Sequence, residues 1–199
     1  MYTDNDISKM SIEEVVDRII HLNKGMYKFW SEPVGWSPTN AAELLSKSRL
    51  DWQLSLTLHL KNWINKVYVE DDYANLILAW VNIGSLVEGT IKLALSVYYN
   101  DYLNDTDIVI SRSQIQGPDT LMLDKLRTFC KGKLWHESSK WDSWILHIQQ
   151  RRNVIHAYKD RELGNFSEFY NDLKEYLEFL RLINGKLPYP DGIFEPREC

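Results

Sequence analysis

Apolar residues recur every three or four positions along most of this chain, which is the spacing of amphipathic helices. A first helix is predicted to begin after Ser11, because Glu14 three residues later completes a capping box. Apolar positions then continue at helical spacing as far as Trp30. The segment from Ser31 to Pro38 contains two prolines and a glycine, and it predicts a turn.

A second helix is expected from Pro38, with Ser37 as its cap, to about Asn65. The same segment contains four alternating leucines that would also suit a strand, namely Leu54, Leu56, Leu58 and Leu60. A helical face passes through this segment as well, and no turn signal flanks the leucines. The sequence therefore predicts a helix that is buried on more than one side.

Four further helices follow from the same periodicity. We expect them from Asp71 to about Leu103, from about Asp119 to Lys131, from about Ser139 to Lys159 and from about Phe166 to Ile183. The polar interruption from Asn104 to Gly117 predicts a mobile loop, and the prolines after residue 185 predict an irregular tail. The pattern indicates an all-α fold, a single helical-bundle domain over residues 1–199 with about five to six helices.

The composition is that of an ordinary globular protein, with 44% hydrophobic and 26% charged residues. No apolar run reaches the ~18 residues that a membrane span needs. The amino terminus is polar and acidic, unlike a signal peptide, and Cys130 and Cys199 are too few for a disulfide framework. We therefore expect a cytoplasmic protein with no membrane segment and no cofactor.

The net charge of −5 argues against indiscriminate binding of nucleic acid by the whole surface. Positive charge is concentrated between Asp124 and Arg161, where nine Lys or Arg stand against four Asp or Glu. This segment either forms a local phosphate-binding face or contributes ordinary solvated helix faces, and its composition fits both interpretations.

The eight residues RRNVIHAY bring together a permanent cation, a proton-transfer group and a phenol, namely Arg151, His156 and Tyr158. A cation can stabilise charge that develops on phosphate oxygens. A histidine can take a proton from a 2′-hydroxyl or give one to a leaving oxygen. The combination therefore indicates chemistry on a phosphodiester.

This stretch resembles the signature of the HEPN superfamily, in which an arginine is followed by four to six residues and a histidine on a late bundle helix. Arg151 and His156 match the four-residue spacing, and Tyr158 matches the extended form found in HEPN toxins. The resemblance implies a helical bundle that is a metal-independent ribonuclease, in a toxin–antitoxin or antiviral defence system. It also implies a homodimer with its site at the twofold axis, and a nucleotidyltransferase-type antitoxin that modifies Tyr158.

The sequence departs from the family pattern at one position. Family members commonly have a small polar residue after the arginine, whereas this chain has Arg152 there and Asn153 next. On a straight helix His156 would lie about 40° from Arg152 and about 140° from Arg151. Helix geometry therefore favours Arg152 and the family spacing favours Arg151. Pairing of two such helices across a twofold axis would let an arginine of one copy approach the histidine of the other.

Glu88 and Lys92 form a second polar constellation, four residues apart within an apolar segment of the third predicted helix. A surface salt bridge explains them, and so does a polar contact with the helix that carries the motif. Gly84 and Gly89 in the same segment would allow another helix to approach closely.

A metal site is not expected. His136-Glu137 lacks the second histidine of an HExxH motif, and no His or Cys cluster has ligand spacing. Most tryptophans are expected in the core, although Trp135, Trp141 and Trp144 lie close enough to the basic segment for one of them to stack on a base.

Three functional hypotheses follow. The first is a metal-independent endoribonuclease that cleaves RNA by 2′-hydroxyl transesterification, with His156 moving the proton and Arg151 stabilising the phosphorus centre. The residues expected to bind RNA or support this site are Arg152, Asn153, Tyr158 and Glu88. The second is a non-catalytic HEPN-like module that binds a nucleotide, RNA or a partner protein. The third is an unrelated helical bundle in which Arg151 and His156 never meet.

Overall fold

The computed structural model describes residues 7–32, 37–64, 73–156, 158–190 and 196–198. Its α-helices are α1 (Ile12–Trp30), α2 (Thr39–Lys47), α3 (Leu50–His59), α4 (Lys61–Ile64), α5 (Tyr73–Val97), α6 (Tyr99–Asn104), α7 (Leu123–Cys130), α8 (Trp141–Arg152) and α9 (Phe166–Asn184). Single 3₁₀ turns are η1 (Ile7–Lys9), η2 (Pro118–Thr120) and η3 (Asn153–Ile155), and the two strands are β1 (Ile110–Ser111) and β2 (Gln114–Ile115). The predicted all-α bundle is confirmed.

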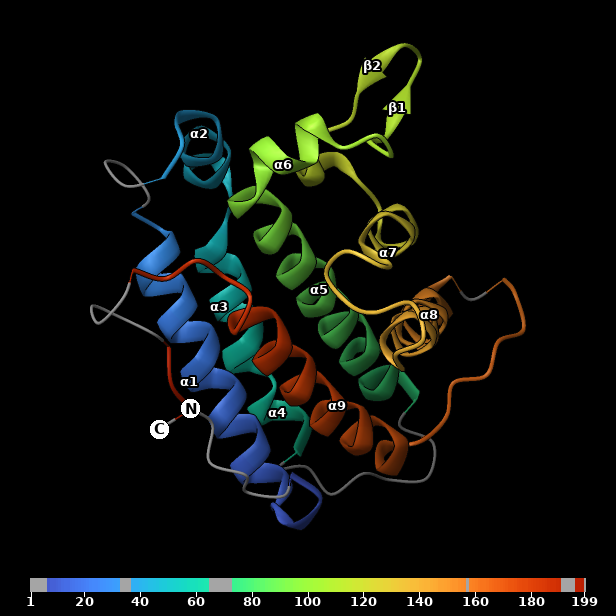
Figure 1. Cartoon of the computed structure of the whole chain (residues 1–199). Helices are drawn as coiled ribbons and strands as arrows, with labels where there is room; N and C mark the ends of the chain where they lie inside the picture. The colour runs from blue at the N-terminus through green and yellow to red at the C-terminus, as the bar shows by residue number, and fades with distance from the viewer. Residues whose placement is uncertain (1–6, 33–36, 65–72, 157, 191–195, 199) are drawn as a thin grey trace.

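The bundle is organised around α5, which runs diagonally through the molecule (Figure 1). α1 and α9 lie side by side on one flank of α5, and α7 and α8 lie on the other. α1 and α9 each begin at a residue whose side chain caps the helix. Ser11 Oγ accepts the backbone N–H of Glu14 at 3.2 Å, and Asn165 Oδ1 accepts the backbone N–H of Glu168 at 3.0 Å.

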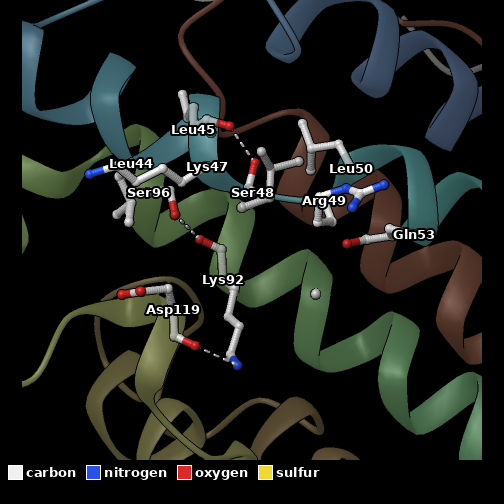
Figure 2. Close-up of a pocket in the computed structure, with 12 residues that line it drawn as sticks. Leu44, Leu45, Lys47, Ser48, Arg49, Leu50, Gln53, Lys92, Ser96 and Asp119 are labelled. Carbon is white, nitrogen blue, oxygen red and sulfur yellow. Dashed lines mark hydrogen bonds between the residues drawn. The ribbon is translucent and has the colours of Figure 1, made fainter.

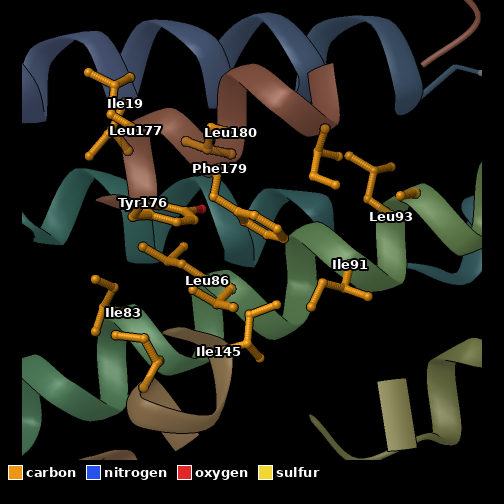
Figure 3. Close-up of a cluster of buried hydrophobic side chains, with 14 of the residues drawn as sticks. Ile19, Ile83, Leu86, Ile91, Leu93, Ile145, Tyr176, Leu177, Phe179 and Leu180 are labelled. Atoms are coloured by element: carbon orange, nitrogen blue, oxygen red, sulfur yellow. The ribbon is translucent and has the colours of Figure 1, made fainter. Parts of the chain in front are cut away.

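The core lies where α5, α8, α9 and α1 meet (Figure 3). Ile83 and Leu86 of α5, Ile145 of α8 and Phe179 of α9 are all completely buried there. The hydroxyl of Tyr176 is enclosed in the same cluster, and burial raises the pKa of this phenol to about 12. This packing places α8, which carries Arg151 and Arg152 of the motif, against α5 and α9.

The apolar positions of α5 at helical spacing are buried from Leu76 through Trp80 and Ile91 to Ala94, but the helix expected as far as Leu103 ends at Val97. By length and composition alone α5 could cross a membrane, with a mean hydropathy of 1.4 over its most apolar window. However, 61% of that window is buried inside the protein, as in the central helix of a bundle. The acidic pair Asp71-Asp72, expected to open this helix, lies outside the described residues.

The single helix expected from Pro38 to Asn65 is wrong, because the chain breaks there into α2, α3 and α4. Ser48 ends α2 in an extended conformation, and its hydroxyl donates to the carbonyl of Leu45 at 2.6 Å. The expected burial on several sides is also wrong. Trp52 is 60% exposed and Leu58 50% exposed, so part of α3 faces solvent although the helix packs against α1 and α5.

The loop expected from Asn104 to Gly117 contains a short antiparallel hairpin, in which Ile110 pairs with Ile115. Arg112 and Ser113 at its tip have φ values of 49° and 62°, which suits the turn of a two-residue hairpin. The hairpin projects from the bundle beside α6 and α7 (Figure 1).

α8 is shorter than the predicted helix from Ser139 to Lys159. It ends at Arg152, continues as the 3₁₀ turn η3, and leaves helical geometry at His156, where φ is −85° and ψ is 72°. The cause is tertiary. Arg151 binds the backbone of Glu162, eleven residues later, so the chain must fold back soon after the helix.

Candidate functional site

Arg151 lies in the last turn of α8 and is buried against the start of α9. Its Nη2 donates to Glu168 Oε2 at 2.7 Å, and its Nη1 donates to the backbone carbonyl of Glu162 at 2.5 Å. The guanidinium carbon is 5.9 Å from the ring centroid of Trp80. Only 7% of the Arg151 side chain is exposed. Within one copy of the chain, Arg151 therefore joins α8 to α9 and to the loop before it.

Arg152 points to a different side of α8, towards α5. Its Nη1 donates to Glu88 Oε2 at 2.5 Å, and Lys92 Nζ lies 2.8 Å from the other carboxylate oxygen of Glu88. Both contacts considered for Glu88, with Lys92 and with the motif helix, are therefore present. Burial would raise the pKa of Glu88, but the hydrogen bonds from Lys92 and Arg152 outweigh it and lower the pKa below its ordinary value.

A glycine of α5 lets Arg152 approach this closely. A Cβ added at Gly84 would lie 2.7 Å from Cδ and 2.9 Å from Cβ of Arg152. The close helix approach expected at Gly84 is therefore present, with the arginine stem lying directly on the glycine.

His156 and Tyr158 are exposed beyond the end of α8, and Asn153 is half-buried at the start of η3. In the described part of the chain the His156 ring forms no hydrogen bond to either arginine. The straight helix on which His156 would lie close to Arg152 is wrong, because the helix ends after Arg152. In one copy of the chain, the motif histidine and tyrosine therefore face solvent, whereas the two motif arginines are paired with carboxylates.

A histidine that the sequence analysis did not single out has the most developed hydrogen-bond environment on α8. His147 Nε2 lies 2.9 Å from Asp172 Oδ2, and the other oxygen of Asp172 accepts the indole N–H of Trp144 at 2.8 Å. Asp172 is itself buried. The indole fixes the carboxylate, and the carboxylate fixes the imidazole, an arrangement that also orients histidines in acid–base sites.

The sequence held only a faint signal for His147. It precedes Arg151 by four residues and so shares a helix face with it. Its partner Asp172 is 25 residues away on α9, and no spacing rule connects the two.

An open pocket of about 310 Å³ lies next to this pair. His147, Gln150 and Arg151 of α8 line one side, and Arg161 and Glu162 of the following loop line the other. The pocket therefore brings two arginines and a histidine together in one place.

A second pocket, of about 280 Å³, lies between the α2–α3 connection and α5 (Figure 2). Lys92 Nζ donates to the backbone carbonyl of Asp119 at its edge, at 3.0 Å. Its cations are all paired with carboxylates, in the ion pairs Lys47–Glu43, Arg49–Asp51 and Lys92–Glu88. Leucines form much of its wall, so it has fewer groups that could bind or react with a ligand than the His147 pocket has.

Most of the basic segment between Asp124 and Arg161 is neutralised by carboxylates. Beyond the two motif arginines, the pairs are Arg127 and Lys131 with Asp142, Lys133 with Asp105 and Asp107, and Lys140 with Glu175 and Glu178. Within the described ranges, Lys125, Lys159 and Arg161 form no ion pair. The segment is therefore no continuous basic face, and of these three cations only Arg161 lines the His147 pocket.

The three tryptophans near the basic segment, for which the core and a base-stacking position were both considered, lie in the core. Trp135, Trp141 and Trp144 are all buried, and each packs against the ring of Phe179. Among the described residues, no three His, Cys, Asp or Glu side chains lie close enough together to hold a metal ion. Cys130 is buried, and burial raises the pKa of its thiol far above the ordinary value.

No protein-family model, no curated protein and no solved structure matches this chain.

Proposed function

We propose that this chain is a metal-independent endoribonuclease of the HEPN type, with a site at the end of α8 that is completed by a second copy of the chain. One observation carries the proposal. His156 is exposed, without a hydrogen-bonded side-chain partner in the described structure, directly beyond a pair of arginines that are held in place by carboxylates. An imidazole in that position is free to reach a 2′-hydroxyl or a leaving oxygen.

The two arginines would have different roles. Arg151 has the family spacing, but it is 7% exposed and bound to Glu168, so it must release a carboxylate before it can bind phosphate. Arg152 is 32% exposed and oriented by Glu88, so it needs less rearrangement to reach a phosphate. In the assembled site we assign the phosphorus centre to Arg151 and RNA binding to Arg152.

Pairing of two copies would bring these groups together. Leu146 of α8 and Ile155 of η3 are exposed apolar side chains that flank the motif, and burying them against a partner is favourable. Tyr158 is fully exposed, so its hydroxyl is accessible to a nucleotidyltransferase-type partner. Adding a nucleotide there would place negative charge next to the RNA site and weaken binding.

The test is cleavage of RNA by the purified full chain in the presence of EDTA. The proposal expects activity to survive chelation and the products to end in a 2′,3′-cyclic phosphate. His156→Ala should abolish cleavage, whereas His59→Ala, a matched change at an exposed histidine of α3, should leave it unchanged. Equal cleavage by wild type and His156→Ala, or products with a 5′-phosphate, would rule out this site.

A second candidate function is a non-catalytic module that binds a nucleotide, RNA or a protein. The observation that favours it is charge compensation, because both arginines of the motif already pair with carboxylates of the same copy. Binding of RNA without cleavage, by a chain that stays monomeric in light scattering at tens of micromolar, would select this function.

A further inference from the structure

The pocket beside His147 brings together two arginines and a histidine from α8 and the loop that follows it. Arg161 is half-buried at its wall and forms no ion pair in the described part of the chain. Arg151 lies in the same pocket, and its Nε is buried without an acceptor among the described residues. Arg151 is paired with Glu168, whereas the charge of Arg161 is left uncompensated by the described residues, so an anion that enters the hollow stabilises it.

The third group is held in a fixed orientation. Asp172, which is buried, binds His147 Nε2 and leaves the other ring nitrogen for a ligand. When the imidazole is protonated, that nitrogen is a donor and the ring adds a positive charge. The His147 side chain is 37% exposed, so a ligand in the pocket can reach it.

Three carboxylates contact these cations, those of Asp172, Glu168 and Glu162, and the last of them can leave. The Glu162 carboxylate lies 3.4 Å from Arg151 Nη2, but its side chain is 85% exposed. A weak, solvated ion pair of this kind contributes little to stability. Glu162 therefore occupies the position of an anion without being firmly held in it.

We propose that this pocket binds a phosphate group, with Arg161, Arg151 and His147 as its ligands and with Glu162 as the group that the phosphate displaces. Planar guanidinium groups match the geometry of phosphate oxygens, and a hollow of about 310 Å³ exceeds the volume of one phosphate group, so it also admits part of an attached nucleoside. The phosphate belongs either to a free nucleotide or to an RNA strand. The pocket shares Arg151 with the proposed cleavage site but does not contain His156, so phosphate binding can be measured separately from cleavage.

The test measures binding to the full-length His156→Ala chain, so that RNA stays intact. Isothermal titration is carried out with inorganic phosphate, a nucleoside monophosphate and a short single-stranded RNA. Arg161→Ala and His147→Gln should each weaken binding about tenfold, the effect of one lost charged contact. Glu162→Gln should tighten binding several-fold, because it removes the competing carboxylate.

The matched control is Lys125→Ala, which removes the same charge from an exposed and unpaired position on α7, outside the pocket. It should leave binding unchanged. Mononucleotide binding that depends on Arg161 identifies a nucleotide site, and dependence seen only with RNA identifies a backbone phosphate. Equal losses in Arg161→Ala and Lys125→Ala, or no change in Glu162→Gln, would overturn the proposal. If the wild-type chain does not cleave RNA but these binding effects hold, the phosphate-binding pocket is supported and the proposed ribonuclease activity is ruled out.

Discussion

Arg151 and Arg152 are neighbours in the sequence, yet they belong to two different regions of the molecule. Arg151 is enclosed between Trp80, Glu168 and the backbone of Glu162, with 7% of its side chain exposed. Arg152 lies over Gly84 and is 32% exposed. One step along a helix turns a side chain by about 100°, which is enough to separate a structural anchor from a half-solvated cation.

The two arginines differ in the effect that their loss would have on the groups around them. Without Arg151, a buried volume is emptied, and Glu168 loses its partner at the start of α9. Without Arg152, Glu88 keeps its ion pair with Lys92. The Arg151 region should therefore respond to substitution as a core site does, and the Arg152 region as a supported surface site does.

The largest expected effect is that of Arg151→Ala. Breaking a buried ion pair costs about 3 to 5 kcal/mol, and the partial exposure of Glu168 reduces this to about 2 to 3 kcal/mol. Arg152→Ala should cost about 1 kcal/mol, because Lys92 still neutralises Glu88. Urea unfolding followed by circular dichroism measures both values. Equal losses for the two variants would show that the two regions do not differ as described.

A smaller effect is expected from Gly84→Ala. The added methyl group would press on the Cβ of Arg152, which cannot move without moving α8. Overpacking of this kind costs about 1 to 3 kcal/mol, and the gain of about 1 kcal/mol in helix propensity offsets part of it. We expect a net loss of about 1 kcal/mol in thermal or urea unfolding.

Gly89→Ala is the matched control on the same helix. There the added methyl group meets only the side-chain amide of Gln53, which can rotate away. This variant should be neutral or more stable by up to about 1 kcal/mol. If Gly89→Ala is destabilised and Gly84→Ala is not, the close contact of α5 would lie at Gly89 and not at Gly84.

The pH dependence of stability should distinguish Glu88 from a similar pair at the surface. The pKa of Glu88 is lowered in the folded state from an ordinary value of 4.5, so its stabilisation is fully present above that pH. It is lost as the pH falls through the lowered pKa, because the unfolded chain then binds the proton more readily. Glu88→Gln should flatten the decline of stability below pH 4.5.

Glu43→Gln provides the comparison, because Glu43 and Lys47 form the same four-residue pair while fully exposed. Solvent screens that pair, so the variant should change the acid decline little, and high salt should remove the change. A larger effect at Glu43 than at Glu88 would contradict the burial argument.

The smallest effect on stability is expected at His156. Its side chain is exposed and makes no hydrogen bond in the described structure, so His156→Ala should change the free energy of unfolding by less than about 0.5 kcal/mol. The same variant is expected to lose all cleavage. A loss of activity with an unchanged unfolding curve would therefore report on chemistry, whereas a large loss of stability would mean that His156 has a structural role.

Local patterns in the amino-acid sequence were enough to predict the fold class and several helix boundaries. Local signals were sufficient at Ser11, whose side chain caps α1, and in α5, whose apolar positions at helical spacing are buried from Leu76 to Ala94. Such features depend on residues three or four positions apart, and these neighbours are always present in a helix. A contact between Glu88 and the motif helix was one of the two explanations considered for Glu88 and Lys92, because a charged pair in an apolar helix needs a polar neighbour.

The end of α8 and the contacts of its side chains could not be predicted in this way, because they depend on tertiary packing. The length of α8 depends on the bond from Arg151 to Glu162, and the orientation of His147 depends on Asp172, 25 residues away. The exposure of α3 likewise depends on which neighbours cover it. Contacts between residues far apart in the chain leave no periodic signal, because their partners are brought together by packing and not by spacing along the helix.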